Sequence, residues 1–143
     1  EYIEKYFARF SGVHAYMTDV VSRAKADGYV TTLFGRRRDL PELKSSNFNL
    51  RSFGERVALN MPIQGTAADI IKAAMVRVDA RMRAEGLEAQ LLLQVHDELD
   101  FSVPAGEVER LSDMVASVMD SVVELKVPLI AEVSSGENWA EAH

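Results

Sequence analysis

The feature that most constrains the fold is a pair of strand-like runs joined by a short acidic tip. The incoming run, 91–95, is mostly apolar, and the outgoing run, 99–103, alternates apolar and polar residues. This alternation is typical of a half-buried strand, and Pro104 ends it because proline cannot donate a ladder hydrogen bond. The sequence therefore predicts a hairpin that holds Asp97 rigidly at its turn.

Length and composition predict one folded unit. At 143 residues and 48% hydrophobic content, the chain can bury one core, and we expect a single domain or part of one. It has no cysteine, which excludes disulfides and thiolate zinc sites and suits a reducing cytoplasm. No run approaches the roughly 18 apolar residues that span a bilayer, so no membrane partner is expected. Because the chain begins without methionine, we expect it to be a piece of a longer protein.

The charge pattern gives two indications. A net charge of −6 argues against nonspecific attraction to nucleic acid, which usually requires a basic excess. Arg36, Arg37 and Arg38 nevertheless form a local basic run after Gly35, and the guanidinium fork suits phosphate oxygens. A solvated hairpin or an intramolecular salt-bridge patch explains the same run equally well, so both interpretations stay open.

Apolar spacing predicts helices in the first half of the chain. The segment before Gly28 places its apolar residues on one helical face, and the glycine is expected to end that helix. The residues at 29–34 are rich in β-branched and aromatic types, which favours an extended segment. A second helix is expected over about 49–60. Pro62 and Gly65 predict a break after it, because neither continues a helix without cost.

The second half predicts a mixed arrangement. Thr66 is expected to cap a helix that ends at Gly86, and the hairpin is followed by a helix near 108–122 and a strand at 127–133. This order predicts an α+β fold in which helices pack on a small antiparallel sheet. Three strands are marginal alone, so an exposed edge awaiting a partner strand is expected.

The acidic tip suits a metal site. Magnesium prefers oxygen ligands and commonly uses one or two carboxylates together with substrate phosphates, which makes Asp97 the leading candidate ligand. Taken alone, Asp97 is also an ordinary polar turn residue, and His96 beside it an ordinary surface residue.

Four segments resemble a known family when they are read together. They are GYVTTLFGRRR at 28–38, NMPIQGTAAD at 60–69, QVHDEL at 94–99, and the ending at 136–143 that opens with GENW. Each resembles a motif of the bacterial DNA polymerase I family, the group that includes the Klenow fragment. The resemblance covers essentially the whole chain and implies an incomplete palm and fingers portion of a polymerase domain. Residues 1–65 would be fingers-derived helices with a connecting hairpin, and residues 66–143 the palm portion with the carboxylate hairpin, in one contiguous fragment.

The resemblance assigns roles at the hairpin tip. Asp97 would be one of the family's two catalytic aspartates and would hold Mg²⁺, Glu98 would be the adjacent and less essential acid, and His96 would lie near the primer terminus. Two magnesium ions would act in the intact enzyme. The family's other aspartate, and its nucleotide-binding helix with a lysine and an aromatic residue, do not occur in this sequence.

The resemblance also implies a DNA-binding surface. Arg56, Asn60 and Gln64 would line the minor-groove side of the primer–template duplex. Hydrogen-bond acceptors on every base pair there allow the geometry of the pair to be checked without reading its sequence. Gly65 would let backbone and nucleic acid approach closely. When the resemblance is set aside, the sequence favours solvent-facing helix positions for Arg56 and Asn60, and a loop or cap position for Gln64.

The expected function is therefore that of the carboxyl-terminal part of a DNA-directed DNA polymerase. The full chain would act in bacterial DNA replication and repair, in the cytoplasm at the nucleoid. Its partners would be primer–template DNA, deoxynucleoside triphosphates and the remainder of the polymerase chain, and the isolated piece is expected to be inactive. Two alternatives stay open: a noncatalytic module that grips duplex nucleic acid, and a metal-dependent nuclease. The sequence opposes the nuclease, because no second cluster of acids or histidines accompanies Asp97 and Glu98.

Overall fold

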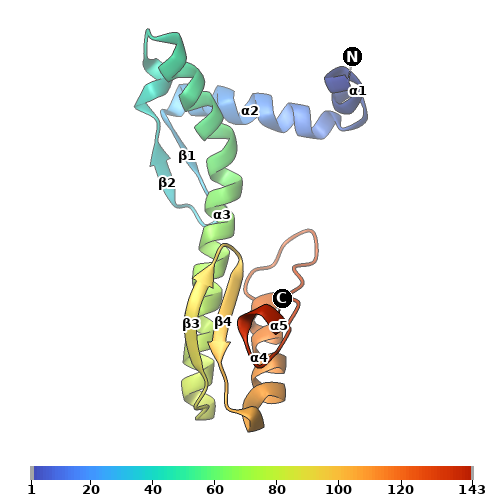
Figure 1. Ribbon diagram of the computed structural model, residues 1–143. Coiled ribbons are helices and arrows are strands. Elements are labelled where there is room, and N and C mark those ends of the chain that lie inside the picture. The colour runs from blue at the N-terminus through green and yellow to red at the C-terminus, as the bar shows by residue number, and fades with distance from the viewer. Residues whose placement is uncertain (1, 143) are drawn as a thin grey trace. The chain divides into compact units, whose positions relative to one another are not determined.

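The computed structural model describes residues 2–142 and contains helices together with two small antiparallel sheets (Figure 1). This confirms the predicted α+β class. Contacts divide the chain between Asp69 and Ile70 into two compact units, which we call the amino-terminal and carboxyl-terminal units. The long helix α3, Phe48–Glu85, contributes to both. None of the described helices is long and apolar enough to cross a membrane.

The amino-terminal unit begins with two helices. Helix α1 spans Tyr2–Arg9 and α2 spans Ser11–Asp27. Gly28 takes a left-handed φ of 83° and donates its N–H to the carbonyl of Ala24 at 2.8 Å, which confirms the predicted helix end. A 3₁₀ helix, η1, follows at Pro41–Lys44. The core of this unit comprises Val20, Ala24, Val30, Leu40, Leu43, Ala58 and Met61.

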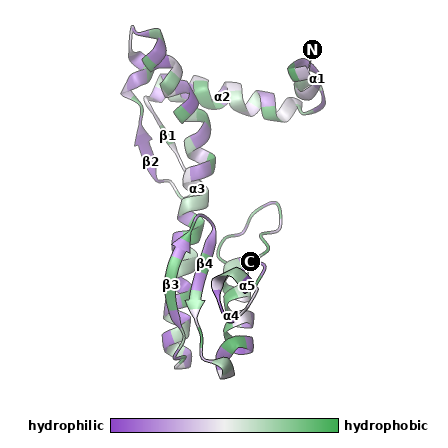
Figure 2. Ribbon diagram, viewed as in Figure 1, coloured by the Kyte–Doolittle hydropathy of each residue, from purple (hydrophilic) through white to green (hydrophobic). Residues whose placement is uncertain are grey.

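A short hairpin lies between α2 and η1. Strand β1, Tyr29–Thr31, pairs antiparallel with β2, Arg37–Asp39. The sequence predicted the extended segment and left a solvated hairpin open for the arginine run; β2 completes such a hairpin, and its residues Arg-Arg-Asp are all hydrophilic (Figure 2). The Arg37 guanidinium lies 3.8 Å from the centroid of the Tyr29 ring, so a cation–π contact supports a strand with low intrinsic propensity.

The predicted break at Pro62 and Gly65 is wrong, because α3 continues through both residues. Proline removes one helical donor, but the surrounding turns are held by packing: Ala58 is fully buried and Met61 is 8% exposed. The Thr66 hydroxyl, predicted to cap a new helix, instead donates to the carbonyl of Pro62 inside the same helix. Tertiary contacts therefore offset the weak local propensity.

The carboxyl-terminal unit packs the end of α3 with a hairpin and a helix. Gly86 has a φ of 66° just after α3, as predicted for a helix stop. Strand β3 spans Gln90–Val95 and β4 spans Glu98–Ser102, followed by the 3₁₀ helix η2 at Ala105–Glu107. Helix α4 is Val108–Asp120, close to its predicted range, and α5 is Trp139–Ala142. The buried core comprises Val78, Met82, Ala89, Leu111, Met114, Val115 and Val118.

The predicted strand at 127–133 is also wrong, because that segment has no regular secondary structure. Its backbone is used differently: the N–H of Ala131 donates to the Asp120 carboxylate at 2.6 Å. Pro128 has no N–H to offer a ladder, and Val127 and Ile130 are 65% and 73% exposed. Both sheets that the structure describes therefore have two strands.

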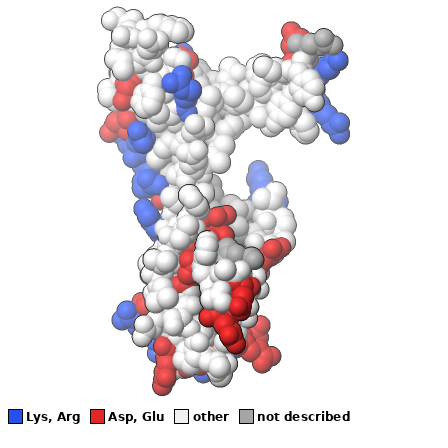
Figure 3. Space-filling model, viewed as in Figure 1, with Lys and Arg blue, Asp and Glu red and all other residues white. Residues whose placement is uncertain are grey.

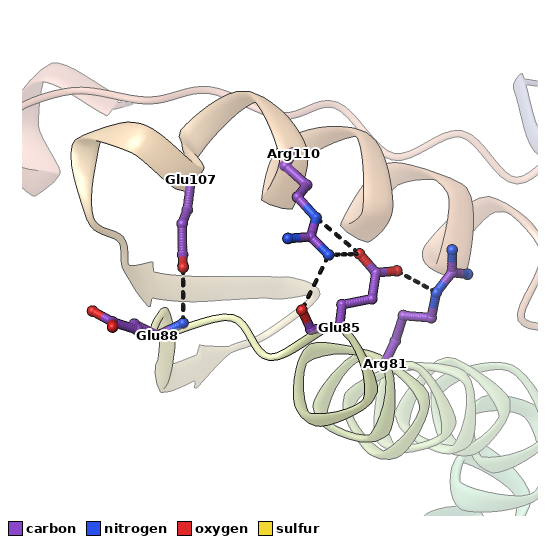
Figure 4. Close-up of polar contacts among 5 residues, drawn as sticks. All are labelled: Arg81, Glu85, Glu88, Glu107 and Arg110. Atoms are coloured by element: carbon purple, nitrogen blue, oxygen red, sulfur yellow. Dashed lines mark hydrogen bonds and ion pairs between the residues drawn. The ribbon is translucent and has the colours of Figure 1, made fainter.

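Two glutamates tie the end of α3 to the start of α4 (Figure 4). The Glu85 carboxylate accepts from Arg81 at 2.6 Å and from Arg110 at 3.2 Å. The Glu107 carboxylate accepts the backbone N–H groups of Glu88 and Ala89, each at 3.0 Å. The hydrogen bond from Arg81, with the charges of both arginines, lowers the pKa of Glu85 below its ordinary value of 4.5.

The lowered pKa predicts an acid-sensitive contribution to stability. A group whose folded-state pKa is depressed stabilises the fold above its unfolded pKa and loses that effect as pH falls through the folded value. We expect Glu85→Gln to lower Tm slightly at pH 7, and the gap to the unmodified chain to narrow as pH falls below 4.5 and to close once pH is below the lowered folded-state pKa. Thermal unfolding over pH checks this. Glu109→Gln, which removes an exposed carboxylate of α4, is the control, and a gap independent of pH would contradict the prediction.

Candidate functional site

The acidic tip lies at the turn of the β3–β4 hairpin, as predicted. Val95 pairs with Glu98, so His96 and Asp97 form a two-residue turn between the antiparallel strands. His96 takes a φ of 53°, a left-handed conformation in which histidine is enriched relative to most residues. Its carbonyl accepts a hydrogen bond from the Gln94 amide at 2.5 Å. The local geometry therefore fixes the Asp97 backbone between two paired strands.

The tip projects into solvent. His96, Asp97 and Glu98 are all exposed, and no described residue makes a hydrogen bond or ion pair with the Asp97 carboxylate. Among residues 2–142, no three acids or histidines come together as a metal-binding group. Asp97 can therefore offer a carboxylate to a cation, and the described residues supply no complete cage around it.

Asp100 is a further carboxylate near the tip that sequence reasoning did not single out. It lies on β4 opposite Leu93, beside the irregularity in pairing between Leu91 and Leu93. Its Oδ2 is buried and has no hydrogen-bond partner among the described residues. An alternating strand places such a residue on the polar face, so nothing in the sequence distinguished Asp100 from a solvated side chain.

The predicted DNA-binding residues form one line along α3. Arg56, Asn60 and Gln64 are all exposed, and their spacing of four places them on one helical face. Because α3 does not break at Pro62, Gln64 continues the line that Arg56 and Asn60 begin. The structure thus brings these three side chains together, and we call them the donor stripe.

The arginine run has mostly internal partners. Arg36 contacts the Asp69 carboxylate at 2.7 Å, and Arg37 contacts Asp39 at 2.6 Å. Both contacts fit the salt-bridge interpretation that the sequence left open. Arg38 is exposed and pairs through its backbone with Val30. The phosphate contacts of all three arginines stay predictions. Arg38 is the best placed of them to bind a phosphate, because its guanidinium makes no ion pair with any described residue.

The net charge differs sharply between the two units. Residues 1–69 contain ten Lys or Arg and eight Asp or Glu, whereas residues 70–143 contain six and fourteen. The amino-terminal unit is therefore +2 and the carboxyl-terminal unit −8. Figure 3 shows Lys and Arg along the side of the amino-terminal unit that carries β2, and Asp and Glu over α4 and α5. The overall negative charge thus hides a locally basic unit.

Comparison with known proteins adds an independent finding. The model of DNA polymerase family A matches residues 1–141. The chain is 55% identical to DNA polymerase I of Geobacillus stearothermophilus over 142 residues, which is 99% of this chain and 16% of that protein. It is 53% identical to DNA polymerase I of Mycobacterium leprae over 140 residues, covering 98% and 15%.

A solved structure matches as well. It is the POL domain of Pol1 from M. smegmatis, in complex with DNA primer-template and dNTP, with a TM-score of 0.95 and 51% identity. The match covers 98% of this chain and 25% of that one. The chain thus spans about a sixth of the length of the curated relatives that it matches. The family match across nearly all residues, together with the identity above one half, shows that the chain belongs to DNA polymerase family A.

Proposed function

We propose that this chain forms part of a DNA-directed DNA polymerase that extends a primer with deoxynucleoside triphosphates on a template strand. The observation that carries the proposal is the exposed Asp97 carboxylate at the turn of an antiparallel hairpin, in a member of this family. The structural relative holds primer-template and dNTP, which supports the same partners here. By the same family membership we propose a role in replication and repair at the bacterial nucleoid.

The donor set at the hairpin tip fits magnesium. Mg²⁺ is bound through one or two carboxylates together with waters and substrate phosphates, rather than by an all-protein cage. Asp97 offers an exposed carboxylate of this kind, and Glu98 places a second acid beside it. When bound, two ions would activate the primer 3′-hydroxyl and stabilise the leaving pyrophosphate. The other aspartate of the pair would come from a part of the polymerase outside these 143 residues.

The negative charge of the carboxyl-terminal unit is a further reason to expect cations at the hairpin tip. The carboxyl-terminal unit carries a net charge of −8, which repels both a triphosphate and the DNA backbone. A bound divalent ion is the largest local charge in such a site and reverses that repulsion. The role of Asp97 is then to hold positive charge where phosphates must approach, with its backbone fixed by strand pairing.

The donor stripe supplies the complementary surface for duplex DNA. Arg56 and the amides of Asn60 and Gln64 donate hydrogen bonds, and the minor groove offers acceptors at every base pair. This chemistry suits contacts that accept any correctly paired sequence. The stripe lies in the unit with a net charge of +2, which favours approach of the phosphate backbone.

One assay separates this function from its alternatives. The complete polymerase chain is incubated with magnesium, an end-labelled primer on a template, and one nucleotide at a time. A primer lengthened only by the nucleotide complementary to the template base supports the proposal. A shortened primer would indicate a nuclease, and a gel shift with an unchanged primer would indicate a noncatalytic duplex-binding module.

Arg38 makes a specific prediction about duplex binding. Losing one contact between an arginine and a phosphate should make the slope of log affinity against log salt shallower by about 0.9. We therefore expect Arg38→Ala to weaken duplex binding at low salt and to flatten the salt dependence by about one phosphate. The control is Arg23→Ala, which removes the same charge from an exposed ion pair with Asp19 on α2. Equal slopes for Arg38→Ala and the unmodified polymerase would contradict this role.

A further inference from the structure

The part of α3 that carries the end of the donor stripe is the part with the weakest helical propensity. Pro62 has no N–H, so the carbonyl of Ala58 lacks its usual helical partner. Gly65 lies three residues later, inside the helix, where glycine is disfavoured by its backbone entropy. Gln64 sits between these two residues. The position of its side chain therefore depends on whatever holds this stretch of α3 in shape.

A loop from the β1–β2 hairpin grips this stretch directly. The backbone N–H of Leu33 donates to Thr66 Oγ1 at 2.9 Å. The Arg36 guanidinium donates through Nε to Asp69 Oδ1 at 2.7 Å and through Nη2 to the Gly65 carbonyl at 3.0 Å. We call these contacts of residues 32–36 with α3 the loop clamp. It spans one helical turn, from Gly65 to Asp69.

The glycine is required by the clamp. A Cβ built on Gly65 would lie 2.7 Å from the Thr32 methyl Cγ2 and 3.3 Å from Arg36 Nη2. Thr32 is itself only 4% exposed, so it has little room to move away. The close approach that the sequence assigned to nucleic acid at Gly65 is therefore made in this structure by the chain's own loop.

The clamp and the donor stripe use different faces of α3. Arg56 and Gly65 are nine residues apart, about two and a half turns, so they point in opposite directions from the helix axis. The loop therefore supports α3 from behind and leaves the stripe open. Arg36 makes two of the three hydrogen bonds of the clamp and pairs with a carboxylate that is only 12% exposed.

We propose that Arg36 is a positioning residue for Gln64, a proposal that rests on the function proposed above. By tying the Gly65 carbonyl and the Asp69 carboxylate to one guanidinium, Arg36 holds the turn of α3 that follows Pro62 in helical form. Without Arg36, we expect α3 to kink at Pro62, since helix kinks of more than about 20° occur mainly at proline and a few other features. Gln64 would then turn away from the line of Arg56 and Asn60. Recognition groups lose function with displacements of about 0.5 Å.

A double-mutant cycle on the complete polymerase tests this proposal. Single-turnover extension of a matched primer is measured for Arg36→Ala, Gln64→Ala and the double variant. We expect Gln64→Ala to slow extension by roughly 30-fold and Arg36→Ala by roughly 10-fold, both within the range expected for losing a side-chain contact to a base edge. The double variant should be no slower than Gln64→Ala, because residues that act through one another are not additive.

The outcomes discriminate between positioning and simple stabilisation. If the two effects multiply in the double variant, Arg36 does not act through Gln64 and the proposal is overturned. Arg36→Lys, which can keep the pair with Asp69 but lacks the planar fork that also reaches Gly65, should recover only part of the rate. If Arg36→Ala fails to fold, Arg36→Lys takes its place in the double-mutant cycle.

A matched control removes an arginine whose ion pair lies near the carboxyl end of α3, away from the loop clamp. Arg83→Ala breaks an exposed ion pair with Asp79 on α3 and should leave the extension rate within about twofold, since exposed pairs contribute little. An unchanged rate for Gln64→Ala alone would remove Gln64 from the duplex surface and overturn this proposal with it. The proposed polymerase activity itself is tested separately by the one-nucleotide assay, so the two failures are distinguishable.

Discussion

Asp97→Ala in the complete polymerase is expected to slow primer extension by at least about a thousandfold, equivalent to roughly 4 kcal/mol of transition-state stabilisation. The change removes an exposed carboxylate at a turn whose backbone is fixed by strand pairing, so the hairpin should keep its shape. The loss would come from the two-metal chemistry, in which a carboxylate places positive charge beside the reacting phosphate. Single-turnover extension at saturating DNA and nucleotide measures it.

Duplex affinity provides the internal comparison for this variant. Removing one negative charge from a unit of net charge −8 reduces repulsion of DNA, so binding should not weaken by more than about twofold. Asp113→Ala, which removes an exposed aspartate from α4, should extend primers at the unmodified rate. Glu98→Ala should lose less activity than Asp97→Ala. Retained extension in Asp97→Ala would take that residue out of the catalytic role.

The features that the sequence predicted best are those decided by neighbouring residues. The β3–β4 hairpin follows from alternation and a turn of two polar residues, and Gly28 and Gly86 end helices because they take left-handed conformations. Both kinds of signal act within a few residues along the chain. For the same reason the position of Asp97 at the bend was predictable, although its role was not.

The errors concern features that distant contacts decide. Pro62 and Gly65 read as a break because their local cost is clear, but a loop 33 residues away supplies Arg36 and Leu33 to hold the helix together. No local pattern links Arg36 to Asp69. Contacts from another strand also decide β2, where the sequence left a hairpin as one of two interpretations: Arg37 is held by a ring and a backbone partner from β1.

The opposite error occurred at 127–133, where apolar residues were taken for a strand. Such a run becomes a strand only if another backbone pairs with it, and Pro128 weakens any such pairing. In the described part of the chain, no packing covers the side chains of Val127 and Ile130, which are largely exposed. Their apolar character is therefore not explained by the core of this unit, and the sequence had no means of showing that.

The isolated 143-residue chain is expected to give no detectable primer extension under conditions in which the complete polymerase extends most primers. Bridging two ions about 3.5–4 Å apart requires carboxylates from more than one place, whereas the described residues bring no three acids or histidines together. Asp97 alone would leave the ions incompletely held in a strongly anionic unit. Primer extension with magnesium over a range of enzyme concentrations measures the activity.

This result is informative only if the isolated chain is folded, so helix content by circular dichroism and cooperative thermal unfolding serve as the first control. Adding the remainder of the polymerase as a separate chain is the second, and restored extension would locate the missing ligands there. Restoration should fail when the 143-residue chain carries Asp97→Ala but succeed when it carries Asp113→Ala. Extension by the isolated, unmodified chain would show that Asp97 completes its cation site with residues of this chain, which contradicts the division of the site across two parts of the polymerase.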